Sequence, residues 1–275
     1  MVADQQFTQS LRAVRVFDVL LLALVPVVLG VVAQLPTETL ESFVFNTGSP
    51  ELLTAYTAHF VHANTTHLAG NLIVYTVAAP LAYLLAVMAG RRGFFLLSFG
   101  ALLVLFPFAL SLMQLSFPDE RLVLGFSGIN AGFFGLLSLS LVCYAQAVFS
   151  ERIEIRYAPV VLFVLTGVIA LVALPERAWR VEIALGSFAL ALAYVGAFFY
   201  RHGMPERAAV KRALDQPGYV ELAGVSLGAV VAYPIVGFQE VVFFGDAVTD
   251  VYVHLLGYCF AFIVLFLFVV VVEEL

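Results

Sequence analysis

Long apolar stretches alternate with short polar segments along the whole chain. A transmembrane helix needs about 20 mostly apolar residues, and about eight stretches approach or exceed that length. The sequence therefore predicts an all-α, polytopic transmembrane helical bundle with about eight spans. The expected spans cover residues 17–35, 67–88, 94–115, 127–149, 157–174, 179–200, 219–237 and 251–272.

Several of these stretches contain a proline, and two of these prolines are interpreted as kink positions. Pro107 lies in span 94–115 and Pro234 in span 219–237. Proline removes a backbone donor and crowds the preceding turn, so we expect a kink in each span.

Composition supports the membrane class and excludes others. The 275 residues are 63% hydrophobic and 12% charged, whereas a soluble domain is about 25% charged. The net charge is −6 and no long basic block is present, so nucleic acid is not an expected partner. Lys211 is the one lysine among 13 basic residues, a skew that hints at a GC-rich source or a salt-adapted one, such as a salt-adapted archaeon. Cys143 and Cys259 lie in apolar runs and are interpreted as small core residues.

The basic residues predict the orientation, because cytoplasmic loops are enriched in lysine and arginine. With eight spans and a cytoplasmic N-terminus, three basic residues lie outside: Arg121, Arg177 and Arg180. The others lie inside: Arg12, Arg15, Arg91, Arg92, Arg152, Arg156, Arg201, Arg207, Lys211 and Arg212. The expected protein is a multi-pass plasma-membrane protein, one domain over residues 1–275, with both termini cytoplasmic.

Two connecting segments are long. Residues 36–66 form a long outer loop that carries His59 and His62. Residues 201–218 form a cytoplasmic basic loop, which is either solvated or contains a short amphipathic surface helix. Asp18, near the start of the first span, is expected at the inner interface, with a buried partner as the alternative.

Three polar clusters open the second, fourth and eighth spans. His67 and Asn71 are four residues apart, so they share one helix face, and both can donate hydrogen bonds. Ser127 follows Gly125, precedes Gly128 and is followed by Gly132 and Gly135, which suits close helix packing. His254 is followed by Gly257 and Ala261, which place small residues on its own face.

The three clusters share one depth. The three spans all run from outside to inside, and each cluster begins within about one helical turn, or 5.4 Å, of the outer end. A serine, a histidine and oxyanion donors are the groups that acyl transfer needs. We therefore expect a single site near the outer surface.

These motifs resemble the rhomboid family of intramembrane serine proteases. The resemblance implies a six-helix core, here with about two additional helices, and cleavage of transmembrane protein substrates near their outer ends. It implies no cofactor and no metal. Ser127 corresponds to the nucleophile and His254 to the general base. The supporting positions are His67, Asn71, Gly125, Gly128 and His62, and the helix-packing positions are Gly132, Gly257 and Ala261.

The histidine needs something to orient it. Family members often place an aromatic residue four positions after the serine, where this chain has Ala131, so Phe133 or Phe134 is a possible substitute. Asp250 is either a helix cap or a third catalytic member. An acidic outer rim of Glu240, Asp246 and Asp250 would raise the pKa of His254, so activity is expected to fall in mild acid.

Other functions remain open. A catalytically inactive rhomboid-like protein would bind transmembrane helices without cleaving them. A small transporter would carry polar residues near the middle of the bilayer or show symmetry between its halves, and neither is seen. A metal site at His59, His62 and His67 is not expected, because their spacing matches no strong zinc signature.

Overall fold

The computed structural model describes residues 7, 9–117, 119–174, 179–204, 207–237 and 251–274. Three short 3-10 turns, η1 (Leu11–Ala13), η2 (Ala58–Phe60) and η3 (Ile155–Tyr157), accompany the helices, and two short strands pair as β1 (Phe45–Asn46) and β2 (Leu122–Val123). The helices are α2 (Val16–Val32), α3 (Thr37–Glu41), α4 (Leu52–Thr57), α5 (Thr65–Met88), α6 (Arg92–Val104), α7 (Phe106–Gln114), α8 (Ser127–Val148), α9 (Pro159–Ala173), α10 (Arg180–His202), α11 (Arg207–Leu214), α12 (Tyr219–Val236) and α13 (Val251–Glu274).

Helix length and composition define a multi-pass integral membrane protein. Within the described residues, six helices are long and apolar enough to cross a membrane, and the bent pair α6–α7 makes a seventh if it counts as one span. The six are α5, α8, η3 with α9, α10, α12 and α13. Helix α2 is apolar but has only 17 residues, about 26 Å at 1.5 Å per residue.

The two proline predictions have different outcomes. The expected span 94–115 is divided at Leu105 into α6 and α7, which meet at an angle of 44°. Pro107 lies in the first turn of α7, where its missing N–H costs no helical hydrogen bond. Pro234 lies in the last turn of α12, and the helix continues through it to Val236. The helix is unbroken at this second proline, as α2 and α5 are at Pro26 and Pro80.

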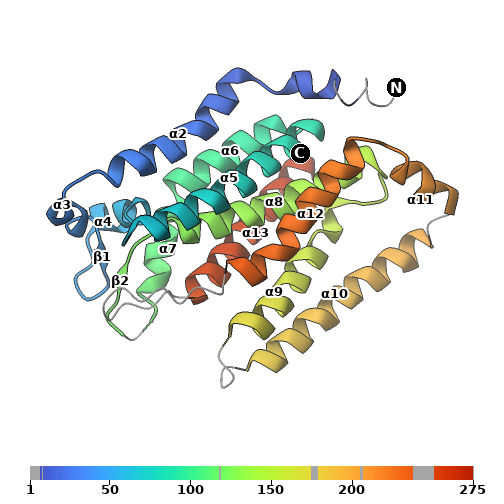
Figure 1. Ribbon diagram of the computed structural model, residues 1–275. Coiled ribbons are helices and arrows are strands. Elements are labelled where there is room, and N and C mark those ends of the chain that lie inside the picture. The colour runs from blue at the N-terminus through green and yellow to red at the C-terminus, as the bar shows by residue number, and fades with distance from the viewer. Residues whose placement is uncertain are drawn as a thin grey trace.

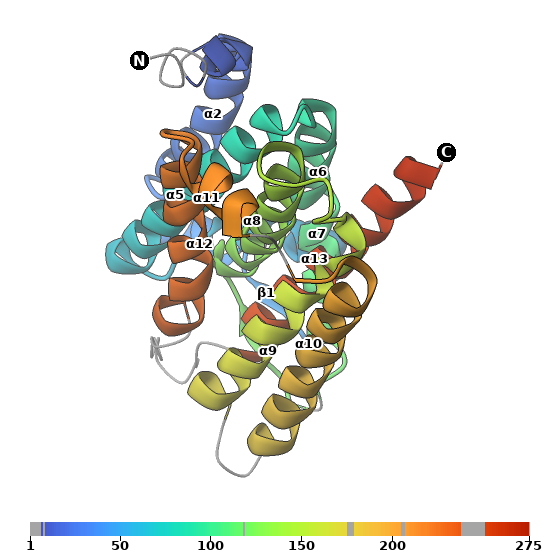
Figure 2. The same ribbon diagram turned by 90° about the vertical axis from the view of Figure 1, so that its right-hand side faces the viewer.

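Helix α8 forms the centre of the bundle. It packs against α5 and α13 along its length and also contacts α12, α6 and α7. Figure 1 shows α2 along one edge of the molecule and the α9–α10 hairpin at the opposite edge. Figure 2 confirms that α10 lies outermost beside α9, its main neighbour. The bundle therefore has an enclosed core around α8 and a peripheral hairpin.

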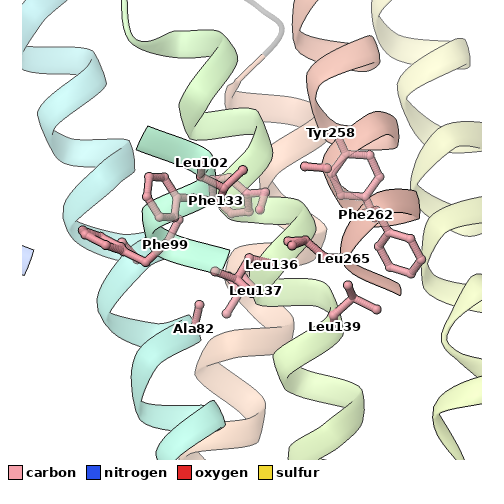
Figure 3. Packing of buried hydrophobic residues seen from close by; sticks show 14 of the residues in the cluster. Ala82, Phe99, Leu102, Phe133, Leu136, Leu137, Leu139, Tyr258, Phe262 and Leu265 are labelled. Atoms are coloured by element: carbon pink, nitrogen blue, oxygen red, sulfur yellow. The ribbon is translucent and has the colours of Figure 1, made fainter. Parts of the chain in front are cut away.

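Aromatic and aliphatic side chains fill the space around α8 on both of its sides. Figure 3 shows Phe133 of α8 beside Phe99 and Leu102 of α6, whereas Tyr258 and Phe262 of α13 lie on the other side. In lipid, apolar side chains gain little from leaving the solvent, so close packing of this kind supplies much of the helix association.

The long loop 36–66 is structured. It contains α3, β1, α4 and η2. Strand β1 pairs in antiparallel fashion with β2, with Phe45 opposite Val123 and Asn46 opposite Leu122. Because β2 directly precedes the polar cluster around Ser127, this pairing connects loop 36–66 to the residues that lead into α8. At the other end of the bundle, residues 201–218 contain the helix α11, so the helical alternative is the one the structure has.

His59 is buried in this loop, and its burial should make the stability of the protein depend on pH. Its Nε2 lies 3.0 Å from Ser111 Oγ, and that hydroxyl donates to the Ala55 carbonyl at 2.7 Å. Burial lowers the pKa of His59 from 6.5 to about 4. The unfolded chain therefore binds more protons than the folded chain between pH 6.5 and 4, and stability falls as the pH falls through this window.

We expect the free energy of unfolding of the wild-type protein to fall by about 3 kcal/mol across that pH window because of His59, at about 1.4 kcal/mol per pKa unit. His59→Gln removes the titrating group, so its unfolding temperature in detergent should depend less on pH between 7 and 4.5. Parallel pH curves for the two proteins would contradict the prediction.

Candidate functional site

Ser127 is the first residue of α8, and its side chain is half-buried. The first backbone N–H groups of a helix have no partner within that helix, and they carry the positive end of the helix dipole. The N–H groups of Ser127 and Gly128 are in this position. The start of α8 therefore combines a hydroxyl group with donors that can hold a developing negative charge.

Gly125 gives the segment before Ser127 its shape. Its φ is +108°, a region that residues with a side chain rarely adopt, and its N–H donates to the Ala58 carbonyl at 3.0 Å. A Cβ at this position would lie 2.6 Å from Cε1 and 2.9 Å from Nε2 of His67. Both conformation and space therefore require glycine here, and the imidazole of His67 lies against the backbone two residues before Ser127.

His67 is fixed by the first turn of α5. Asn64 caps this helix, because its Oδ1 accepts from the His67 N–H at 2.8 Å. The His62 ring packs edge-on against His67 with 5.1 Å between the ring centroids. Burial, and then the neighbouring His67, lowers the pKa of His62 to about 4. His62 is therefore neutral at physiological pH and packs against the side of His67.

Asn71 joins α5 to α8 through a residue that the motif analysis did not single out. Asn130 Nδ2 donates to both Oδ1 and the backbone carbonyl of Asn71, each at 3.0 Å. Asn71 Nδ2 in turn donates to the His67 carbonyl at 3.1 Å. Asn130 follows Ser127 by three residues and is 2% exposed. An amide side chain inside an apolar helix, one turn after the serine, is the sequence signal that indicates a buried hydrogen-bond partner here.

Helices α8 and α13 are in contact through small residues. A Cβ on Gly257 would lie 2.9 Å from the Gly128 carbonyl oxygen, and one on Gly135 would lie 3.4 Å from the Ala261 Cβ. Because residue numbers rise together along both helices, the two helices are parallel. Gly132 points elsewhere: its Cβ would meet Phe106 and Leu102 of α7 and α6. The small face expected at Gly128, Gly132 and Gly135 is therefore divided between two neighbours.

His254 lies one turn before Gly257, at the end of α13 that is level with the start of α8. Its side chain is 7% exposed, and its Nδ1 lies 3.1 Å from the Gly237 carbonyl oxygen. A carbonyl can only accept, so Nδ1 carries the proton in the neutral ring and Nε2 is left as an acceptor. This is the tautomer that a general base needs when Nε2 faces the hydroxyl group.

Ser127, His67, Asn71 and His254 thus lie at the same end of α8 and of the two helices, α5 and α13, that pack on it. Within the described residues, no hydrogen bond joins Ser127 Oγ to His254. Catalytic hydrogen bonds are often long or poorly aligned until substrate binds. The structure therefore gathers the residues at one level without closing that bond.

Phe133 and Phe134, the aromatic residues after Ser127, contact aromatic rings of other helices. Phe133 contacts Tyr75 and Phe99, and Phe134 stacks on Tyr233 of α12, with 3.9 Å between the centroids. Glu240, Asp246 and Asp250, the expected acidic rim, lie outside the described residues. Across the described part of the chain, no group of three histidine, cysteine, aspartate or glutamate side chains could hold a metal ion.

Comparison with known proteins finds no match: no family model, no curated protein and no solved structure matches the chain. The class that the fold defines is a multi-pass helical membrane protein. Any more specific function has to be argued from the site itself.

Proposed function

We propose that this protein is a rhomboid-like intramembrane serine endopeptidase that cleaves transmembrane proteins near the outer membrane face. The observation that supports the proposal best is the parallel packing of α5 and α13 on α8. This packing sets Ser127, His254, His67 and Asn71 at one end of the bundle. The proposed enzyme uses a serine–histidine pair and needs neither a cofactor nor a metal.

In the proposed reaction, His254 Nε2 takes the Ser127 hydroxyl proton while Oγ attacks the scissile carbonyl carbon. The resulting oxyanion accepts hydrogen bonds from the Ser127 N–H, His67 and Asn71. His254 then gives its proton to the leaving amine, and the C–N bond breaks. Water, deprotonated by His254, attacks the acyl-enzyme and releases the carboxylic acid product together with the free Ser127 hydroxyl.

The proposal includes a topology. Helix α2 is the first span, since 17 residues are at the lower limit for crossing a bilayer. The bent α6–α7 pair is the third span, which gives eight in total and both termini on the cytoplasmic side of the plasma membrane. The peripheral α9–α10 hairpin is the addition to a six-helix core, because α10 contacts mainly α9.

A fluorophosphonate probe tests the proposal directly, because it reacts with activated serine hydroxyls. Purified wild type should be labelled in detergent, and Ser127→Ala and His254→Ala should lose the label. Cleavage of a reconstituted transmembrane substrate should be lost in the same two variants. Ser138→Ala, on the same helix and buried, is the matched control and should label like wild type.

Two outcomes would redirect the interpretation. Absence of labelling in a folded wild-type protein would favour the catalytically inactive, helix-binding alternative. Labelling that persists in His254→Ala would show that another group activates Ser127. A transporter is less well supported, because the hollow of about 580 Å³ that the structure describes lies away from the candidate site. It is lined by residues of η3 and α10 and by Phe266 of α13, and Arg156 and Arg201 are among them.

A further inference from the structure

We infer that the C-terminal end of α12 is the element that positions His254, with the Gly237 carbonyl in the place that a carboxylate occupies in a catalytic triad. The inference rests on the proposed function. It assigns a role to Gly237 and Tyr233, which lie outside the three sequence motifs, and to Phe134, which lies in the motif that opens α8. Gly237 and Tyr233 act through His254 and are positioning residues.

The hydrogen bond sets the state of the imidazole. Nδ1–H donates to the Gly237 carbonyl at 3.1 Å, so Nε2 is the unprotonated nitrogen of the neutral ring. A carbonyl offers this orientation without a full negative charge. It therefore stabilises the imidazolium that forms during catalysis less than a buried carboxylate does.

The position of that carbonyl is set by an aromatic stack. The Gly237 N–H donates to the Tyr233 carbonyl at 2.8 Å and closes the last turn of α12. The Tyr233 ring lies directly on Gly237, since a Cβ there would be 2.5 Å from the ring Cε2. Tyr233 also stacks on Phe134 of α8, with 3.9 Å between the ring centroids and an interplanar angle of 13°.

A series of contacts therefore connects α8 to His254. Phe134 of α8 stacks on Tyr233, Tyr233 packs against the end of α12, and the Gly237 carbonyl accepts a hydrogen bond from His254. Phe134 lies seven residues after Ser127, so one rigid helix carries both the nucleophile and the support of its base. The aromatic residue that was expected to pack on the histidine here supports it indirectly, through Tyr233 and Gly237.

Two variants test this series of contacts. Gly237→Ala forces a methyl group against the Tyr233 ring, and Phe134→Leu removes the stack. Displacing a catalytic group by about 1 Å can cost about 10²-fold, so each should lower the rate constant of fluorophosphonate labelling by about 10- to 100-fold. Phe133→Leu is the matched control. It makes the same change at a buried neighbouring position that faces α5 and α6, and its labelling rate should stay within about threefold of wild type.

A spectroscopic readout separates positioning from general destabilisation. In protein with ¹⁵N-labelled histidine, the His254 signal, assigned with His254→Gln, should show a protonated Nδ1 at neutral pH. The same preference should survive in Phe133→Leu and be lost in Gly237→Ala and Phe134→Leu. If the tautomer and the labelling rate do not change in these two variants, or change equally in Phe133→Leu, the inference is wrong.

If the proposed function is wrong, the same experiments give a different pattern of results. Wild type would then not label at all, whereas the Nδ1 signal would still report whether α12 orients the ring. Labelling of wild type at Ser127, combined with an unprotonated Nδ1, would keep the protease and overturn the positioning role.

Discussion

Replacing Asn71 with alanine is expected to slow acylation of Ser127 by about 10²–10³-fold, the usual cost of losing one oxyanion donor. Asn71 is 6% exposed and lies one turn beyond His67 on the face of α5 that meets α8. One of its two amide hydrogens is bound to the His67 carbonyl, which leaves the second for the oxyanion. The measurement is the labelling rate constant, with substrate cleavage as a second assay.

Asn130→Ala is the control for this prediction, because it removes the hydrogen bond to Asn71 Oδ1, together with the one to the Asn71 backbone carbonyl, without removing the donor. Hydrogen bonds between membrane helices contribute about 0.6–1.7 kcal/mol. Asn130→Ala, which loses both bonds, should therefore lower the unfolding temperature at least as much as Asn71→Ala, which loses only the bond to Oδ1. Only Asn71→Ala should show the full loss of rate, and Asn130→Ala should lose about tenfold, because the Asn71 amide is then less firmly oriented. Equal rate losses in the two variants would mean that Asn71 has a structural role only.

Apolar periodicity and length were sufficient to locate the long helices. The expected span 127–149 is α8, Ser127–Val148, and the expected span 219–237 is α12, Tyr219–Val236. The break at Leu105 lies next to Pro107, where a kink is expected, whereas Pro26 and Pro80 lie inside the unbroken helices α2 and α5. These features depend on local chemistry, and local chemistry can be read from one sequence.

The contacts that build the site are of another kind. Asn130 and Asn71 are 59 residues apart, and His254 and Gly237 are 17 apart across a connection between two helices. Periodicity shows that a helix has a buried face, but it does not show which partner that face meets. The motifs placed Ser127, His67 and His254 at one depth, whereas the groups that orient them depend on tertiary packing.

Asp18 is the clearest example of a partner that the sequence did not reveal. It was expected at the inner interface, yet its side chain is 1% exposed. Arg92 contacts both carboxylate oxygens, with Nε 2.7 Å from Oδ2, and the Tyr83 hydroxyl donates to the same Oδ2 at 2.7 Å. The buried alternative is therefore correct, and a charge on α2 is paired with one 74 residues away at the start of α6.

This ion pair matters because α2 has little else to hold it. Its buried residues, Asp18, Leu22, Val25 and Leu29, form one narrow stripe, and the Tyr75 hydroxyl donates to the Leu22 carbonyl at 2.9 Å. Along the rest of its surface α2 is exposed (Figure 1). Loss of the pair should therefore loosen the N-terminal end of α2 before it disturbs the core around α8.

We expect Arg92→Ala to lower the stability of the protein, because it leaves the Asp18 carboxylate without its counter-charge. Asp18→Ala should lower the stability less, since Arg92 keeps 29% exposure and can reach water. The double variant should be more stable than Arg92→Ala alone. Reversible unfolding in mixed micelles measures all three variants, and the double-mutant cycle isolates the coupling between the two charges. Additive losses would show that the pair contributes no coupling and that α2 is held by its apolar stripe.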